Sequence, residues 1–474
     1  MLGLFGTLNM ATRSMQAQMT GVEVAGQNLA NVNTTGYSRQ SVNIQTSPDI
    51  TTGIGSEGTG ANATSIQQIV NTLLNSQVQN QQSTSGYWNG QQSALQSAQN
   101  ALGEFLNGTA STSSTTSATS DSSTGLASQL NGLFSAFQAV ATSPTSTTAR
   151  QALIGQAQTL ATTFNNVSTQ LDSLKTSLNS VLGDNINSAN KLLSGIATLN
   201  QQISAAQFSG GTANDLLDAR EQDLENLAQL TNITTSTETN GAVDVSIDGQ
   251  ALVTGYKVAD TLTTYAAGNN TTLVQTSNGH QLLAQTSGSM QGTIDARDGT
   301  LATLQTNLDT LASTLIAQVD AIHTGGYSLT GSTGANFFAG SSASTINVNP
   351  ALAANPNLIQ TSGSATASGD NTVALQLAQL GSTTQSALGN QTFNDNYDAA
   401  VAALGDSLAT ANTQVTNQTA VSQMLSTQRS SVSGVSVDQE MTSLMAYQRA
   451  YEASAQLVTT INTLMGDTLA MKTS

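Results

Sequence analysis

Residues 28–40 read NLANVNTTGYSRQ, a distinctive stretch in a chain that is otherwise rich in Ser, Thr, Asn and Gln. The stretch holds no histidine, cysteine or carboxylate, so it predicts a structural element and not an active site. Asn31 and Asn33 tolerate left-handed backbone angles and Gly36 adopts them freely, which predicts a helix end followed by a turn. Tyr37 then supplies a large ring with a polar tip, which is typical of an anchor.

The residues before this turn carry the pattern of an amphipathic helix over 7–30. Apolar side chains recur at alternating steps of three and four residues, with Gln18 at the one polar position: Leu8, Ala11, Met15, Val22, Ala25 and Leu29. This spacing predicts a helix about 36 Å long that carries a single narrow apolar seam.

The other end of the chain repeats this design. After SGVSVDQEM (433–441), Ser436 and Gln439 predict a capping box at the start of a helix about 50 Å long. Its apolar residues follow heptad steps that are interrupted by the polar Gln448 and Asn462: Val437, Met441, Leu444, Tyr451, Ala455, Val458, Met465 and Leu469. Neither terminal helix can bury its seam alone, so we expect the two to pack on each other or on other copies.

The composition excludes several classes of function. Charged residues make up 8% of the 474 residues and the formal net charge is −17, so no basic surface for nucleic acid or an anionic membrane can form. Cysteine is absent, which excludes disulfides and thiolate sites. The chain has no apolar run of about 18 residues, so we expect no transmembrane helix. The first residues also lack the pattern of a cleaved signal peptide.

Between the termini, the periodicity is mostly helical. Helical spacing resumes at Ile66 and runs to about residue 106, and it continues over 126–230, where Asn214 is the expected N-cap of the last helix. It returns over 301–319 and again over about 372–431. The chain is long enough for about two to four domains of this kind.

One segment changes to a two-fold period. Val243, Val245 and Ile247 alternate with polar residues and are followed by Asp248-Gly249, which predicts two strands joined by a tight turn. Similar text continues to about residue 290. The predicted fold is therefore mainly α, with long terminal coiled-coil helices, an elongated helical bundle and a small outward β-rich domain.

No constellation of catalytic or metal-binding residues stands out. His280 and His323 are the two histidines, and they lie far apart in different contexts. A lone histidine is more often a surface or core residue than a ligand, and no Ser-His-Asp spacing or carboxylate pair is evident. The sequence therefore predicts no enzyme activity, no cofactor and no metal.

The stretch that opens this section resembles the bacterial flagellar axial proteins, which carry NIANVNTPGYxRQ-like text after an N-terminal helix. Its GYSRQ ending (36–40) is most similar to the flagellar hook-associated protein 1 family, as is the closing text GVSVDQEMTSLMAYQRAYEASAQLVTTINTLMGDTL (434–469). NDLLDAREQDLENLAQL (214–230), VDVSIDGQALVTG (243–255), SGSMQGTIDARDGTL (287–301) and HTGGYSLTGSTGANFF (323–338) resemble its middle, in the family's order.

The chain also departs from the family pattern at two places. Gln68 and Asn71 stand where the family usually carries a basic and an acidic residue, so a salt bridge there is in doubt. Thr35 replaces a proline that many relatives have, which predicts a less rigid turn.

The resemblance implies an exported structural adapter that joins the flagellar hook to the filament. Its partners would be the hook protein, a second hook-associated junction protein, other copies of itself in a ring, the filament cap during assembly, and an export chaperone on the C-terminal helix. It implies a terminal axial domain (1–60 with 436–474), a discontinuous helical domain (61–235 with 291–435) and a β-rich insertion (236–290). The location would be the extracellular flagellum, reached by type III export without a cleaved signal.

The resemblance also assigns roles to residues. The two seams would form the assembly interface of an inner tube, Asn31, Asn33, Gly36 and Tyr37 would form a hinge, and Arg39 and Gln40 would reach polar partners. Gln448, Arg449 and Tyr451 would contact other subunits or the chaperone. Both terminal segments are expected to be largely disordered in the free chain.

Two other readings remain. The flagellar hook protein shares the terminal signatures, and a secreted adhesin would explain the acidic, Ser/Thr-rich composition.

Overall fold

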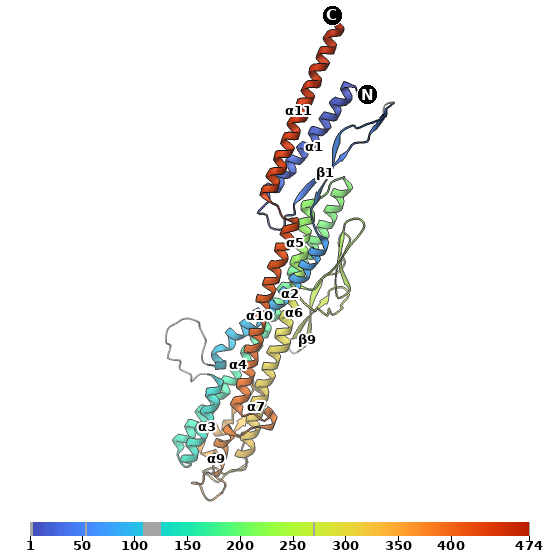
Figure 1. Cartoon of the computed structure of the whole chain (residues 1–474). Helices are drawn as coiled ribbons and strands as arrows, with labels where there is room; N and C mark the ends of the chain where they lie inside the picture. The colour runs from blue at the N-terminus through green and yellow to red at the C-terminus, as the bar shows by residue number, and fades with distance from the viewer. Residues whose placement is uncertain (1–2, 53–54, 108–124, 269–270, 474) are drawn as a thin grey trace.

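The computed structural model describes residues 3–52, 55–107, 125–268 and 271–473 of an elongated molecule with both termini at one end (Figure 1). At that end the helices α1 (Leu4–Ala30) and α11 (Val437–Thr473) lie side by side. The prediction of a mainly α fold with long terminal helices and a small β insertion is confirmed. Of the described helices, none is both long enough and apolar enough to cross a membrane.

A β-hairpin lies beside α1 and connects it to the rest of the molecule. Strand β1 (Gln40–Thr46) pairs antiparallel with β4 (Ala61–Gln68), and the short strands β2 (Ile50–Thr52) and β3 (Gly55–Glu57) extend the hairpin. The prediction that a helix resumes at Ile66 is wrong, because this residue pairs with Val42 across the hairpin. A pairing between segments some 20 residues apart leaves little trace in local periodicity.

The body of the molecule is a bundle of long helices. Its main members are α2 (Thr72–Asn107), α3 (Leu126–Thr142), α4 (Thr147–Phe208), α5 (Asn214–Leu230), α6 (Ser289–Asp295), the π-helical turn η1 (Ala296–Leu301), α7 (Ala302–His323) and α10 (Phe393–Ser433).

Helix α4 runs through two separate hydrophobic cores. It has 62 residues, which corresponds to a length of about 93 Å. Its first half, from Leu153 to Leu178, contributes to a large core with α2, α3, α7 and α10, whereas its second half, from Leu182, packs in a smaller core with α5 and the β insertion. Apolar residues that recur at helical spacing on α4 and α7 are buried, among them Leu160, Phe164, Leu308 and Leu315.

The β insertion lies on one side of the bundle (Figure 1). A four-stranded antiparallel sheet has the order β5 (Thr234–Thr237), β6 (Val243–Ile247), β7 (Gln250–Thr254) and β8 (Lys257–Val258), and a hairpin of β9 (Leu262–Gly268) and β10 (Thr271–Thr276) follows. The alternation on β6 is confirmed, since its three apolar side chains are buried. Asp248 and Gly249 both have positive φ, 49° and 74°, as the predicted tight turn requires.

Short elements close the end of the bundle that lies far from the termini. They are β11 (Phe338–Ala339), β12 (Asn347–Val348), α8 (Pro350–Ala354), η2 (Pro356–Leu358), α9 (Thr372–Gln379), η3 (Leu380–Ser382) and η4 (Ser386–Leu388). Two fully buried polar side chains hold these loops. Arg150 donates to the carbonyl oxygens of Pro144 (2.9 Å) and Ile359 (2.6 Å), and His323 Nε2 accepts from the backbone N–H of Gln360 at 3.0 Å.

Candidate functional site

The terminal helices touch at three levels that are seven residues apart. The pairs are Asn28 with Glu440, Gly21 with Tyr447, and Ser14 with Ser454. The Asn28 amide donates to Glu440 at 3.0 Å, and the two serine hydroxyls lie 3.2 Å apart. Residue numbers decrease along α1 as they increase along α11, so the two helices are antiparallel, and the seven-residue repeat is that of a coiled-coil contact.

Small side chains form the contact surface of α1. Its buried residues are Ala11, Ala17, Gly21, Val24, Ala25 and Asn28. A Cβ atom built at Gly21 would lie 2.7 Å from the ring of Tyr447, so only glycine fits at this level. The distance between packed helices depends on the side chains at the contact, so small residues let these helices approach closely.

The predicted seam is displaced from this contact. On α1, the four largest predicted seam residues are only partly buried: Leu8, Met15, Val22 and Leu29. The last three each follow a residue that contacts α11 by one position. On α11, Met441 and Gln448 are exposed, whereas Glu440 and Tyr447, one residue earlier, face α1. Within one chain, these seam positions are therefore displaced by one residue from the contact, whereas the predicted seam residues Ala11 and Ala25 are buried. The pattern selected large apolar residues, whereas the close contact needs small ones.

The other predicted residues of α11 divide into two groups. Leu444, Val458 and Met465 are partly buried. They occupy the same position of the heptad, and their partial burial is compatible with packing against α1. Arg449, Tyr451 and Leu469 are exposed. Because these three side chains are exposed in one chain, their proposed contacts with other subunits stay a prediction.

Asn28 is a buried hub that sequence reasoning missed. It is 1% exposed, its amide nitrogen donates to Gln40 O at 2.8 Å, and its Oδ1 accepts from the hydroxyl of Tyr37 at 2.9 Å. The same oxygen accepts from the backbone N–H of Gln40 at 2.9 Å. The signal was a polar residue seven positions after Gly21, which is the heptad interval.

The turn after α1 depends on one glycine. Gly36 has φ +82°, whereas Asn31 has φ −103° and ends the helix without a left-handed angle. Asn31 instead accepts a hydrogen bond from the Thr34 hydroxyl at 3.1 Å, and Asn33 is exposed. The expectation of left-handed angles therefore holds for Gly36 and not for the two asparagines.

Arg39 and Gln40 reach polar partners, as predicted. Arg39 Nε pairs with Glu440 Oε1 at 2.6 Å, and its Nη1 donates to Gln439 Oε1 at 3.2 Å. Residues 31–40, which follow α1, are called the linker below. The Gln439 side chain, which the sequence assigned to a capping box, thus accepts a hydrogen bond from Arg39 of this linker. Gln40 Nε2 donates to Asp215 Oδ1 at 3.0 Å.

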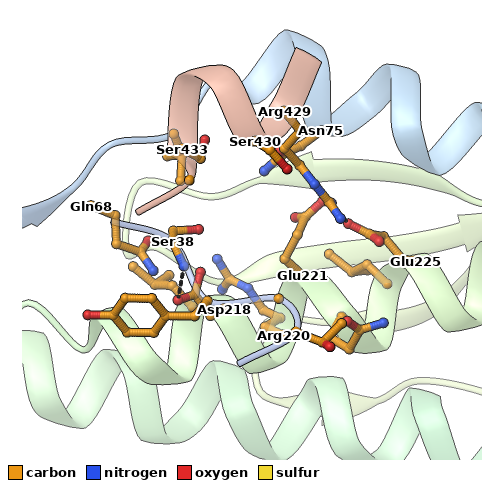
Figure 2. A pocket seen from close by; sticks show the side chains of 18 of the residues that line it. Ser38, Gln68, Asn75, Asp218, Arg220, Glu221, Glu225, Arg429, Ser430 and Ser433 are labelled. Carbon is orange, nitrogen blue, oxygen red and sulfur yellow. Dashed lines mark hydrogen bonds and ion pairs between the residues drawn. The ribbon is translucent and has the colours of Figure 1, made fainter. Parts of the chain in front are cut away.

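Helix α5 receives this linker across a cavity of about 580 Å³ (Figure 2). The turn from Asn31 to Ser38 forms one wall of the cavity, and the acidic face of α5 and the end of α10 form another. Asn214 is the first residue of α5 and not its N-cap, because its side chain donates to Gln40 Oε1 and Ile66 O instead. Burial, together with the charge of Asp215, raises the pKa of Tyr37 to about 12.

Among the described residues, no group of three or more His, Asp or Glu side chains is arranged to hold a metal ion. His280 is exposed, and His323 is enclosed in the loops at the other end of the bundle. The arrangement is suited to holding helices in fixed positions.

Comparison with known proteins gives the class. The description "Flagellar basal body rod FlgEFG protein C-terminal" matches residues 426–471, which include most of α11. The description "Flagellar hook-associated protein FlgK helical domain" matches residues 112–338.

Two curated relatives match almost the whole chain. "Flagellar hook-associated protein 1" of Bacillus subtilis is 26% identical over 97% of this chain and 96% of the relative, and that of Salmonella typhimurium is 23% identical over 96% and 98%. The solved structure of the flagellar hook junction protein FlgK from Burkholderia pseudomallei has a TM-score of 0.65 and 18% identity, covers 75% of this chain and 100% of that chain, and supports the fold. Over almost its whole length, this chain is similar to the flagellar hook-associated protein 1 family.

Proposed function

We propose that this protein is a structural component of the bacterial flagellum that joins the hook to the filament. The family relationship supports this role, and the helix pair supplies a physical basis for it. The protein would act by assembling with its neighbours and not by catalysis.

The observation that carries the proposal is an apolar surface on the helix pair that one chain does not cover. On α11 the exposed apolar side chains are Val437, Met441, Met445, Tyr451, Leu457, Leu464, Leu469 and Met471. On α1, Phe5 is 74% exposed and Met19 is 53% exposed. Exposed apolar area of this extent marks an interaction surface, and burying a Leu- or Met-sized side chain contributes roughly 1.5–3 kcal/mol.

Neighbouring copies are the proposed cover for this surface. Leu8, Met15, Val22 and Leu29 are only partly buried in one chain, and a second and third copy packed in a ring would cover them further. Gln448, Arg449 and Tyr451 would contact those copies, or the export chaperone before assembly. The hook protein, a second hook-associated protein and the filament cap would meet the ends of the ring.

The proposed domains and location follow the same reasoning. Residues 1–60 with 436–474 would form the axial domain, 61–235 with 291–435 the helical domain, and 236–290 an outward β-rich domain away from the axis. The location would be the extracellular flagellum, reached by type III export.

Deletion of the gene tests the proposal. We expect electron micrographs to show hooks without filaments, and flagellin to appear in the medium, with both defects reversed by the wild-type gene. Missing hooks would indicate the hook protein instead, and intact filaments with lost surface attachment would indicate an adhesin.

The proposed hinge has its own test in Gly36→Val. A β-branched side chain is strained at φ +82°, and its Cβ would lie 3.1 Å from Gln222 Oε1, so filaments should be lost while the helical domain stays folded. Gly210→Val is the matched control, because Gly210 has φ +84° with open space around it. Normal filaments in the Gly36→Val strain, scored by electron microscopy, would contradict the hinge.

A further inference from the structure

Helix α5 carries polar side chains at its start and along one face. Asn214, Asp218, Glu221 and Glu225 follow one another at steps of four, three and four residues, so they share a face, and Asp215 adds a carboxylate in the first turn. Figure 2 shows Asp218, Glu221 and Glu225 around the cavity between α5, the linker and α10.

The start of α5, residues 214–218, holds the linker that leads to the terminal helices. Asp218 Oδ2 accepts from the backbone N–H of Ser38 at 3.0 Å, and Asp215 Oδ1 accepts from Gln40 Nε2 at 3.0 Å. The backbone carbonyl of Asn214 accepts from Gln68 Nε2 at 2.7 Å. The linker before β1 and the end of β4 are therefore both held by the first residues of α5.

The next two turns of α5 hold the helical domain. Glu221 Oε1 accepts from Gln79 Nε2 of α2 at 2.9 Å, and Glu225 forms an ion pair with Arg429 of α10. A single helix face thus contacts the terminal linker at one end and two bundle helices at the other.

The linker itself is held from two sides. Ser38 and Gln40 contact α5, whereas Arg39, between them, contacts Glu440 of α11 and donates its backbone N–H to Ser433 O at 2.8 Å. Successive residues of an extended chain face opposite directions, so three consecutive residues can join α5 to the base of α11.

We propose that Asp215 and Asp218 are positioning residues, and that the start of α5 (residues 214–218) is a clamp that sets the direction of the terminal helix pair relative to the helical domain. The role of this turn goes beyond the proposed junction function. It concerns the isolated chain and does not depend on what that chain joins.

The partial burial of Asp218 supports a positioning role for it over a purely stabilising one. Desolvation raises the pKa of Asp218 above its ordinary value, although the Ser38 hydrogen bonds partly lower it again. Holding an ionised carboxylate away from water costs free energy, so a neutral residue would serve stability alone at least as well.

The test uses the absence of cysteine in the chain. Gln201→Cys on α4 and Ala446→Cys near the base of α11 place spin labels at two exposed positions of the two domains. Pulsed dipolar spectroscopy of the purified chain should give one narrow distance distribution. Adding Asp215→Ala and Asp218→Ala should broaden it, and the Ser38 amide should exchange hydrogen about tenfold faster.

Two further variants separate positioning from a general loss of structure. Asp223→Ala removes the same charge from the same helix, but that carboxylate faces Gly195 of α4, so the distance and the exchange rate should not change. Gln40→Ala releases the linker while leaving α5 intact and should broaden the distribution to a smaller degree. The melting temperature of the helical domain should stay the same in all variants.

Three results would overturn the proposal. They are an unchanged narrow distribution in the double Asp variant, a distribution already broad in the parent chain, and a lower melting temperature with faster exchange throughout the bundle. None of them bears on the filament phenotype of the gene deletion, so the clamp and the junction role can fail separately.

Discussion

The large core of the bundle and the terminal helix pair bury different kinds of side chain. Phe137 and Phe164 are fully buried in the core, whereas the α1 side of the pair is lined by alanine, glycine and valine. In the pair it is the large apolar residues, such as Met441 and Leu464, that are exposed, at 43% and 48%. The core is complete within one chain. The pair has the composition of a surface that other molecules complete.

Phe137→Ala should have the largest effect on the complete region. Phe137 packs against Phe337 with ring centroids 5.2 Å apart, and its removal leaves a cavity that should cost about 3–5 kcal/mol of unfolding free energy. Phe208→Ala is the matched control, because that ring is 95% exposed and its loss should change stability by less than about 0.5 kcal/mol. Urea denaturation measures both, and equal losses would contradict the comparison.

Acid should weaken the same region through His323. Burial, together with the nearby Arg150 charge, lowers the pKa of His323 to about 4 in the folded chain, from 6.5. Between these values the unfolded chain binds a proton that the folded chain does not. The stability is therefore present above about pH 6.5 and is lost as the pH falls towards 4, by about 3 kcal/mol in total.

The measurement for this prediction is the pH dependence of the unfolding free energy. His323→Gln should remove this part of the slope, and His280→Gln, at an exposed position, should leave it unchanged. If the unfolding free energy of His323→Gln depends on pH as steeply as that of the parent chain, groups other than His323 cause the acid sensitivity.

Gly21→Ala should act on the pair alone. The added methyl would lie 2.7 Å from the Tyr447 ring, which should cost about 1–3 kcal/mol of helix pairing and leave the core unaffected. Gly26→Ala on the same helix meets no atom within 4 Å, so it should stabilise α1 by about 0.5–1 kcal/mol. Hydrogen exchange of α1 and α11 measures the change in stability of the pair. A change of the same sign in both variants would exclude the close contact at Gly21.

The smallest expected effect is a difference in the free energy of local opening between the base and the tip of the helix pair. The sequence alone favours disorder throughout both terminal segments, but the buried contacts of Asn28 and Arg39 are concentrated at the base of the pair. We therefore expect protection from hydrogen exchange around residues 433–447 of the free chain, and little protection beyond residue 456. Uniform protection, or none at all, would show that base and tip do not differ.

The periodicities that were predicted correctly are those satisfied within one element and its nearest neighbours. Leu160, Phe164 and Leu171 recur at helical spacing and are all buried, and the alternation on β6 is set by one buried face. The errors have a different origin. Ile66 lies in a strand because of its partner Val42, and the seam register was displaced because a helix pattern does not show which of two adjacent faces meets the partner.

The buried polar residues were also beyond prediction. Asn28, Arg150 and His323 are buried because carbonyl groups and side chains from distant segments satisfy their polar atoms. Burying such groups without partners would cost several kcal/mol, and their partners can be identified only once the chain is folded. Asp215 and Asp218 are less buried, but their partners Gln40 and Ser38 likewise come from a distant segment.

By itself, the sequence determined the helical class, the amphipathic terminal helices, the β insertion and the turn at Gly36, because each follows from local spacing or from a backbone angle that glycine adopts without strain. The tertiary structure alone decided which face of α1 meets α11, and that α5 receives the linker. These choices depend on close approach and on hydrogen bonds between segments up to several hundred residues apart, for which local periodicity carries no signal.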